Sequence, residues 1–334
     1  MMKKTAEYVS IGHPDKVADF ISSYILDKAI EQDPMVKYAV EVLIKENIVI
    51  LGGEIKGNVD LSKLKEYVVE ALAEIGYNKD YAVIWGKYAI DPCEIKILNL
   101  IGQQSDDINK GVEQNGWGDQ GVFVGYACQS EGLVNKELYL ARKLNKALYE
   151  KALCSLNLGI DIKTQITLDD TGNVETAIVA IPMLENEDLT GVVVDVLGIT
   201  PQNIIINGTG VYKTHSSIAD CGVSGRKLAC DFYSTACPIG GGSPWTKDAS
   251  KADLTLNLYA RKLAIDYLED NDEAFVYLSS CIGQSNLTSA VIKTIKNGVE
   301  TNTPLTINKT PTDLINLLGL RKPIFAELCK NGLT

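Results

Sequence analysis

The chain has 334 residues, of which 46% are hydrophobic and 22% are charged, so extensive disorder is not expected. The formal net charge of −11 argues against a nucleic-acid or anionic-membrane partner, because both bind basic surfaces. No apolar run reaches membrane-spanning length, and the start MMKKTAE lacks the apolar stretch of a signal peptide. We therefore expect a cytoplasmic protein with two or three domains.

The first predicted helix begins at Pro14, a residue suited to the first helical position. Its core-facing stripe follows the i, i+4, i+8 pattern at Val17, Ile21, Ile25 and Ala29. His13 and Asp15 then lie at the helix N-terminus, where unpaired backbone N–H groups attract phosphate. Asp15 and a phosphate would need a divalent cation between them. A purely structural capping role for both residues is equally compatible with this spacing.

Strand pairs and helices alternate along the rest of the chain. Three hairpins are predicted, at 36–44 with 48–55, 162–168 with 174–181, and 274–282 with 288–295. Helical patterns occur near each of them, at 61–75, 138–152 and 254–268. This mixed order predicts an α+β protein whose sheets carry helices on one face. The polar segment 104–111 has the composition of a loop that closes over a site.

Residues 220–253 are rich in glycine and carry Arg226, Lys227, Lys247 and Lys251 together with four aspartates. Glycines let backbone N–H groups approach a phosphate, and the basic side chains supply positive charge. No Walker loop is present. Asp253 falls in the first turn of the last predicted helix, where it is either a metal ligand or an ordinary first-turn acid.

Zinc is not expected. The eight cysteines include no C-x-x-C pair, and His215 is distant in sequence from any thiol or acidic cluster. Free thiols are the simpler interpretation.

The segment from Ser10 to Asp19, S-I-G-H-P-D-K-V-A-D, resembles the N-terminal signature of the S-adenosylmethionine synthetases, or methionine adenosyltransferases. Further blocks follow in the family's order, at 52–54, 101–105, 118–127, 163–165, 220–227 and 240–251. The similarity runs from about residue 7 to residue 264. Because the blocks are ordered, they are far more specific than any one of them alone. The chain resembles a shortened, divergent member.

The resemblance implies three similar small domains about a pseudo-threefold axis, here 1–102, 112–212 and 213–334. It implies the conversion of ATP, L-methionine and water to S-adenosylmethionine, pyrophosphate and phosphate, with hydrolysis of the tripolyphosphate. It also implies a homodimer or a dimer of dimers with active sites shared between subunits.

The resemblance also assigns residues to roles. The catalytic residues are His13, poised at ATP C5′, with Lys163, Arg226 and Lys247. The resemblance assigns two magnesium ions per site to Asp15 and Asp253, and it assigns a potassium ion to Glu41. The residues that contact ATP are His13, Asp161, Lys163, Tyr212, Asp220, Arg226, Lys227, Ser243 and Lys247. The residues that contact methionine are Glu54, Gln104, Asp119, Asp220 and Lys251.

Several positions depart from the family pattern, namely Ile11, Val211, Ile239 and the segment 243–246 beside the potassium region. These departures keep open a second reading, a relative that binds ATP or S-adenosylmethionine without turnover. A kinase would need a phosphate loop and a base near an acceptor hydroxyl, and neither is recognisable. The presence of His13, Asp15, Lys163, Lys247 and Asp253 favours the active enzyme, because a pure binder has little use for leaving-group machinery.

Overall fold

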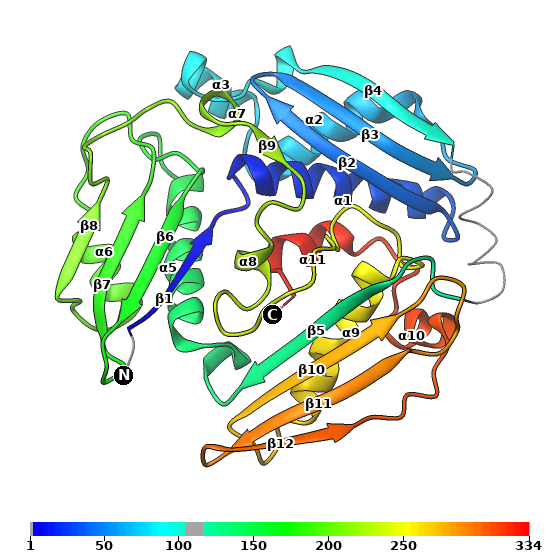
Figure 1. Cartoon of the computed structure of the whole chain (residues 1–334). Helices are drawn as coiled ribbons and strands as arrows, with labels where there is room; N and C mark the ends of the chain where they lie inside the picture. Colours follow the sequence, from blue (N-terminus) through cyan, green and yellow to red (C-terminus); the bar gives the residue numbers. More distant parts are fainter. Residues whose placement is uncertain (1–2, 104–115, 334) are drawn as a thin grey trace.

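The computed structural model describes residues 3–103 and 116–333 and arranges three four-stranded sheets around a central group of helices (Figure 1). The first sheet has the order β4-β3-β2-β9. Its strands are β2 (Lys37–Lys45), β3 (Ile48–Lys56), β4 (Lys96–Gln103) and β9 (Gly222–Val223). Helix α1 (Pro14–Gln32) packs on β2 and β9, and α2 (Leu64–Ile75), which follows the 3-10 turn η1 (Leu61–Lys63), packs on α1.

The second sheet has the order β1-β6-β7-β8 and is covered by α5 (Lys136–Leu153) and α6 (Thr190–Leu197). Its strands are β1 (Lys4–Val9), β6 (Lys163–Leu168), β7 (Val174–Ala180) and β8 (Asn203–Ile206). The third sheet has the order β12-β11-β10-β5 and is covered by α9 (Ala252–Asp266), with α10 (Pro311–Leu317) against that helix. Its strands are β5 (Gly121–Cys128), β10 (Glu273–Ser280), β11 (Ser289–Lys296) and β12 (Val299–Pro304).

Short helices fill the connections, namely α3 (Lys79–Trp85), α7 (Ser216–Ala219), α8 (Leu228–Asp231) and α11 (Phe325–Asn331). Three 3-10 turns complete them, η2 (Gly86–Tyr88), η3 (Pro92–Glu94) and η4 (Glu131–Leu133). The predicted hairpins and helices are confirmed, with ends that differ by a few residues at most. The α+β class with three helix-backed sheets is confirmed as well.

The sheets do not coincide with the expected sequence ranges 1–102, 112–212 and 213–334. Strand β1 pairs with β6, β5 pairs with β10, and β9 pairs with β2, so each sheet includes a strand from another range. The edge strand of a sheet has backbone N–H and C=O groups without partners. Each exchanged strand forms hydrogen bonds with the groups at such an edge. The exchange links the three units through backbone hydrogen bonds.

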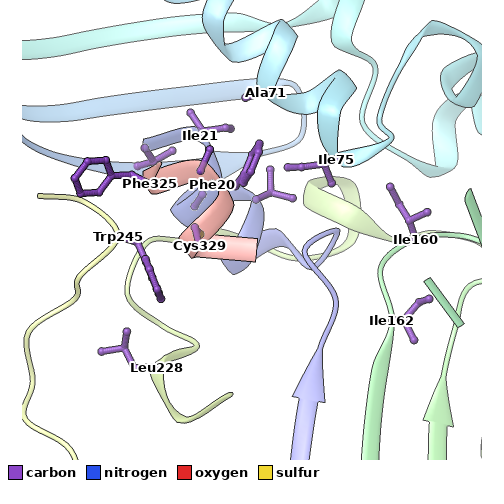
Figure 2. Close-up of a cluster of buried hydrophobic side chains, with 14 of the residues drawn as sticks. Phe20, Ile21, Ala71, Ile75, Ile160, Ile162, Leu228, Trp245, Phe325 and Cys329 are labelled. Carbon is purple, nitrogen blue, oxygen red and sulfur yellow. The ribbon is translucent and has the colours of Figure 1, made fainter. Parts of the chain in front are cut away.

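Helix α1 is buried on nearly every side. The predicted stripe of Val17, Ile21, Ile25 and Ala29 lies in the core, but the polar face is buried too. Figure 2 shows the reason, since α1 is enclosed by α2, by α11 and by the segment that carries Trp245. The carboxylate of Asp27 on α1 accepts from the first backbone N–H groups of α11, at 2.9 and 2.8 Å.

Two findings concern the expectations about membrane-spanning segments and about the cysteines. No helix among the described residues is both long and apolar enough to cross a membrane. All eight cysteines are free thiols, four of them buried, which agrees with the expectation from the sequence.

Candidate active site

His13 occupies the N-cap of α1, where the backbone N–H of Asp15 donates to its Nδ1 at 3.2 Å. A neutral imidazole that accepts at Nδ1 carries its hydrogen on Nε2. The side chain is only 2% exposed. Burial, followed by the charges of Lys227 and Lys163, lowers the pKa of His13 to about 3. His13 is therefore a neutral hydrogen-bond donor at physiological pH.

Asp15 is held in place by two contacts from residues that follow one another closely in the chain. Its Oδ1 accepts from Val223 N–H at 2.9 Å, and its Oδ2 lies 2.5 Å from Lys227 Nζ. Burial raises the pKa of Asp15, but the hydrogen bonds from Lys227 and Val223 outweigh burial and leave the pKa below its usual value. The carboxylate is therefore charged. Gly222 permits the approach of β9 to α1, because a Cβ there would lie 2.1 Å from the carbonyl oxygen of Pro14.

Further predicted residues lie near this pair. Asp161 accepts from Ser216 N–H at 2.9 Å, and burial raises its pKa to about 7. Lys163 opens β6 and is exposed, and its charge acts on both His13 and Asp161. We call this group the His13 cluster; it comprises His13, Asp15, Asp161, Lys163, Tyr212, Asp220 and Lys227.

A second group surrounds the start of α9. Lys247 forms an ion pair with Asp253, and Lys251 occupies the N-cap of the helix. Gly242 lies against the carboxylate, because a Cβ there would be 1.9 Å from Asp253 Oδ1. Ser243 is buried close by, with its Oγ accepting from Trp245 N–H at 3.3 Å. We call Ser243, Lys247, Lys251 and Asp253 the Asp253 cluster.

Strand β2 runs past both clusters within one chain, and they also adjoin each other, because a Cβ added to Gly225 would lie 3.2 Å from Ser243 Cβ. Leu43 lies opposite Val223 beside the His13 cluster, whereas Ala39 forms a bridge with Lys247 of the Asp253 cluster. Four residues of strand correspond to about 13 Å. Glu41 lies between them and accepts from the hydroxyls of Ser224 and Thr246, the latter at 3.0 Å. Among the described residues, no three His, Cys, Asp or Glu side chains form a ready metal site.

The remaining predicted residues are dispersed. Arg226 is exposed beside Lys227, and Glu54 lies on β3 opposite Ala39. Asp119 is exposed before β5, with its carbonyl oxygen accepting from Ser280 Oγ at 2.9 Å. Gln104 and the predicted loop 104–111 lie outside the described residues.

One charged network was not predicted. Asp19 Oδ1 accepts from Gly225 N–H at 2.8 Å, just before Arg226 and Lys227. Lys16 lies 3.5 Å from Asp19 and 2.7 Å from Asp231, which also accepts from Trp245 Nε1 at 2.8 Å. Burial raises the pKa of Asp19 to about 7. The available signal was spacing, since Asp19 follows Asp15 by one helical turn and therefore lies on the same face of the helix.

The second histidine has a structural environment. His215 Nδ1 donates to the carbonyl of Lys213 at 2.8 Å, and the hydroxyl of Tyr81 donates to Nε2. Burial lowers the pKa of His215 to about 4. Trp85 packs edge-on against the ring. These contacts fit a neutral histidine that ties α3 to the segment before α7.

Comparison with known proteins places the chain in a family. Residues 2–106 match the model of the S-adenosylmethionine synthetase N-terminal domain, and residues 214–334 match that of the C-terminal domain. The chain belongs to the S-adenosylmethionine synthetase family. S-adenosylmethionine synthase from Wolinella succinogenes is 31% identical, over 98% of this chain and 91% of that protein. The enzyme of the same name from Helicobacter pylori strain P12 is 31% identical over 96% and 90%.

The fold of this synthetase family member is also found in a solved structure. The structure of an unusual S-adenosylmethionine synthetase from Campylobacter jejuni superposes with a TM-score of 0.88 at 30% identity. It covers 100% of this chain and 95% of the other.

Proposed function

We propose that this chain is a methionine adenosyltransferase, which makes S-adenosylmethionine from ATP and L-methionine and hydrolyses the tripolyphosphate to pyrophosphate and phosphate. The observation that carries the proposal is the position of His13 at the N-cap of α1, where its Nδ1 accepts from Asp15 N–H. A neutral imidazole with its hydrogen on Nε2, fixed at a helix N-terminus beside a carboxylate–lysine pair, suits a leaving group that carries phosphate.

The reaction needs alignment and charge stabilisation more than it needs a base. The methionine sulfur is a neutral, polarizable nucleophile, so no proton has to be removed before it attacks C5′. As the C5′–O5′ bond breaks, negative charge develops on O5′ and along the tripolyphosphate. A donor at His13 Nε2 stabilises O5′, and Lys163, Lys227, Arg226 and Lys247 stabilise the phosphates.

The carboxylates fit magnesium. Mg²⁺ is usually held by one or two carboxylates together with substrate phosphates and water. Asp15 and Asp253 each form an ion pair with a lysine side chain, so each carboxylate already attracts a positive charge. We assign one Mg²⁺ to each, and bound magnesium would neutralise charge on the tripolyphosphate. With magnesium bound, Lys227 and Lys247 would be free to contact phosphate oxygens.

Glu41, with the hydroxyls of Ser224 and Thr246, supplies an oxygen-rich position that we assign to potassium. The departure at 243–246 supplies one of these hydroxyls, that of Thr246. The Trp245 ring contacts Lys16 and Asp231, and its carbonyl accepts from Ser23 Oγ at 2.9 Å.

We also propose a homodimer with shared sites, which is supported by the position of the two clusters at opposite ends of a four-residue stretch of β2. The face of the first sheet opposite α1 carries exposed apolar side chains, with Ile48, Leu98 and Leu100 exposed to 45%, 48% and 60%, and it also carries Glu41, Glu54 and Lys96. A self-complementary face of this kind is buried in a two-fold dimer. We propose that the dimer brings the His13 cluster of one chain to the Asp253 cluster of its partner. A cytoplasmic location stays a prediction.

The test is a product assay with purified protein, ATP, L-methionine, MgCl₂ and KCl. We expect S-adenosylmethionine, pyrophosphate and phosphate in equal amounts, with loss of synthesis when MgCl₂ is omitted and weaker synthesis when KCl is omitted. Binding of ATP without S-adenosylmethionine would instead favour the non-catalytic relative.

A further inference from the structure

A cavity of about 780 Å³ lies along the outer face of α5 and is bounded on its other side by residues of α2 and α11. None of the residues that line it belongs to the His13 cluster or the Asp253 cluster. Ser10 and Ile11 line the cavity, so it adjoins the segment that leads into His13. The volume is in the range of pockets that hold small organic molecules.

One face of α5 gives the cavity its charge. The lining residues of this helix follow a spacing of three and four, at Tyr139, Arg142, Lys143, Asn145, Lys146, Tyr149, Glu150 and Leu153. Three of these side chains are basic and one is acidic, in a chain whose net charge is −11. Lys143 and Lys146 are exposed, and neither has a salt-bridge partner among the described residues. This face therefore attracts an anion.

Arg142 adds a buried donor that lacks a protein acceptor. Its Nη2 donates to the carbonyl oxygens of Cys230, Asp231 and Phe232 at 2.8, 3.2 and 3.3 Å. Its Nε is buried and has no hydrogen-bond partner among the described residues. Because this atom is closed off, it does not contact a ligand in the cavity, and the Nη2 bonds instead fix the guanidinium in the cavity wall, where its charge adds to that of the lysines.

Three tyrosines give the cavity flat apolar surfaces. Tyr8 lies under the Arg142 guanidinium, 5.2 Å from the ring centroid, and the Tyr149 hydroxyl is tied to the carbonyl of Ile75. Tyr139 lies at the η4 end of α5. On the opposite wall Lys330 pairs with Glu74 at 2.6 Å and lies 4.0 Å from Glu327, so the excess of positive charge in the cavity comes from α5 alone. Ring faces beside unpaired cations suit a planar molecule that carries an anionic group.

We propose that this cavity is a second ligand site, which binds a small organic anion with a planar aromatic ring. Lys143 and Lys146 hold the anionic group, the charge of Arg142 adds to their attraction, and the tyrosine rings contact the planar part. The site is independent of the proposed function, because it uses none of the residues assigned to ATP, methionine or metal.

The test uses 8-anilinonaphthalene-1-sulfonate, which combines an aromatic ring system with a sulfonate. Fluorescence titration of the full chain should show one saturable site that persists at saturating ATP and methionine. The double variant Lys143→Glu/Lys146→Glu should bind the probe at least tenfold more weakly. The matched control is Lys63→Glu/Lys65→Glu, which makes the same charge change at exposed positions outside the cavity, and it should bind like the wild type.

Three results would overturn the proposal: unchanged affinity in the cavity variant, equal weakening in both double variants, or displacement of the probe by ATP or methionine. Thermal unfolding followed by circular dichroism verifies that each variant is folded. If the double variant does not fold, Leu153→Trp decides the question, because this exposed residue lines the cavity and a larger side chain would obstruct it without changing charge. Loss of binding in that variant supports the site, and full binding contradicts it.

Discussion

His13 shows how one residue combines a structural and a chemical role. As N-cap it accepts from Asp15 N–H, and this contact is what leaves the hydrogen on Nε2. The sequence predicted its place at the helix N-terminus, because Gly12 and Pro14 frame it. The low pKa was not predictable, since it arises from burial and from Lys227 and Lys163, which are distant in sequence.

Replacement of His13 by Asn keeps a good N-cap and removes the Nε2 donor. We expect His13→Asn to bind ATP nearly as well as the wild type and to form the sulfonium several hundred-fold more slowly, on the order of 4 kcal/mol of barrier. Single-turnover kinetics with an independent ATP-binding titration measures both quantities. An unchanged chemical step would remove His13 from the catalytic residues.

A substitution at Asp231 tests how much the buried network of Lys16, Asp19 and Asp231 stabilises the fold. Asp231→Asn weakens the main ion pair of Lys16 inside the protein, and we expect it to lower the free energy of unfolding by about 3 kcal/mol. The control is Asp266→Asn, which breaks the exposed pair with Lys262 and should cost less than about 1 kcal/mol. Urea unfolding compares the two variants. Similar losses would show that the network is not a significant source of stability.

At the scale of elements, the start of α9 depends on close packing against a glycine. In Gly242→Ala the new Cβ would displace the Asp253 carboxylate, so we expect at least a tenfold loss of affinity for magnesium–ATP, about 1.4 kcal/mol. Gly241→Ala is the control, because a Cβ at that position meets no atom within 4 Å. Titration of each variant with ATP and MgCl₂ measures the difference. Equal affinities for the two variants would place Asp253 outside the nucleotide site.

The contact between α3 and His215 predicts that the free energy of unfolding depends on pH. The folded pKa of about 4 lies below the ordinary value of 6.5, so the neutral histidine stabilises the fold above pH 6.5 and this contribution is lost as pH falls towards 4. In His215→Phe the contribution is absent. The wild type should therefore exceed the variant in unfolding free energy by more at pH 7.5 than at pH 5, by roughly 2 kcal/mol. A gap that does not change with pH would mean that His215 is not buried in its neutral form.

The elements themselves were largely predictable, and their partners were not. Period-two patterns located β2, β3, β6, β7, β10 and β11, and helical periodicity located α1, α2, α5 and α9. The pairing of β1 with β6 and of β5 with β10 joins strands far apart in sequence. Local patterns specify a strand but do not specify its neighbour, so the strand exchange became visible only in the structure.

At the scale of the whole molecule, the proposed shared site predicts complementation. His13→Asn inactivates one cluster and Asp253→Asn inactivates the other. If the site is shared, a mixed dimer contains one intact site, and an equal mixture of subunits should recover about a quarter of wild-type activity. Co-expression with two purification tags isolates the mixed dimers, and each variant alone is the control. No recovery in the mixed dimers would mean that each site is built within one chain.

In the proposed reaction, methionine sulfur attacks C5′ of ATP and displaces an intact tripolyphosphate. Rapid-quench analysis of a single turnover with radiolabelled ATP and excess protein observes that step directly. We predict that S-adenosylmethionine and protein-bound tripolyphosphate appear together in equal amounts, before any pyrophosphate or phosphate. Formation of ADP or of an adenylated methionine, without S-adenosylmethionine, would contradict the account.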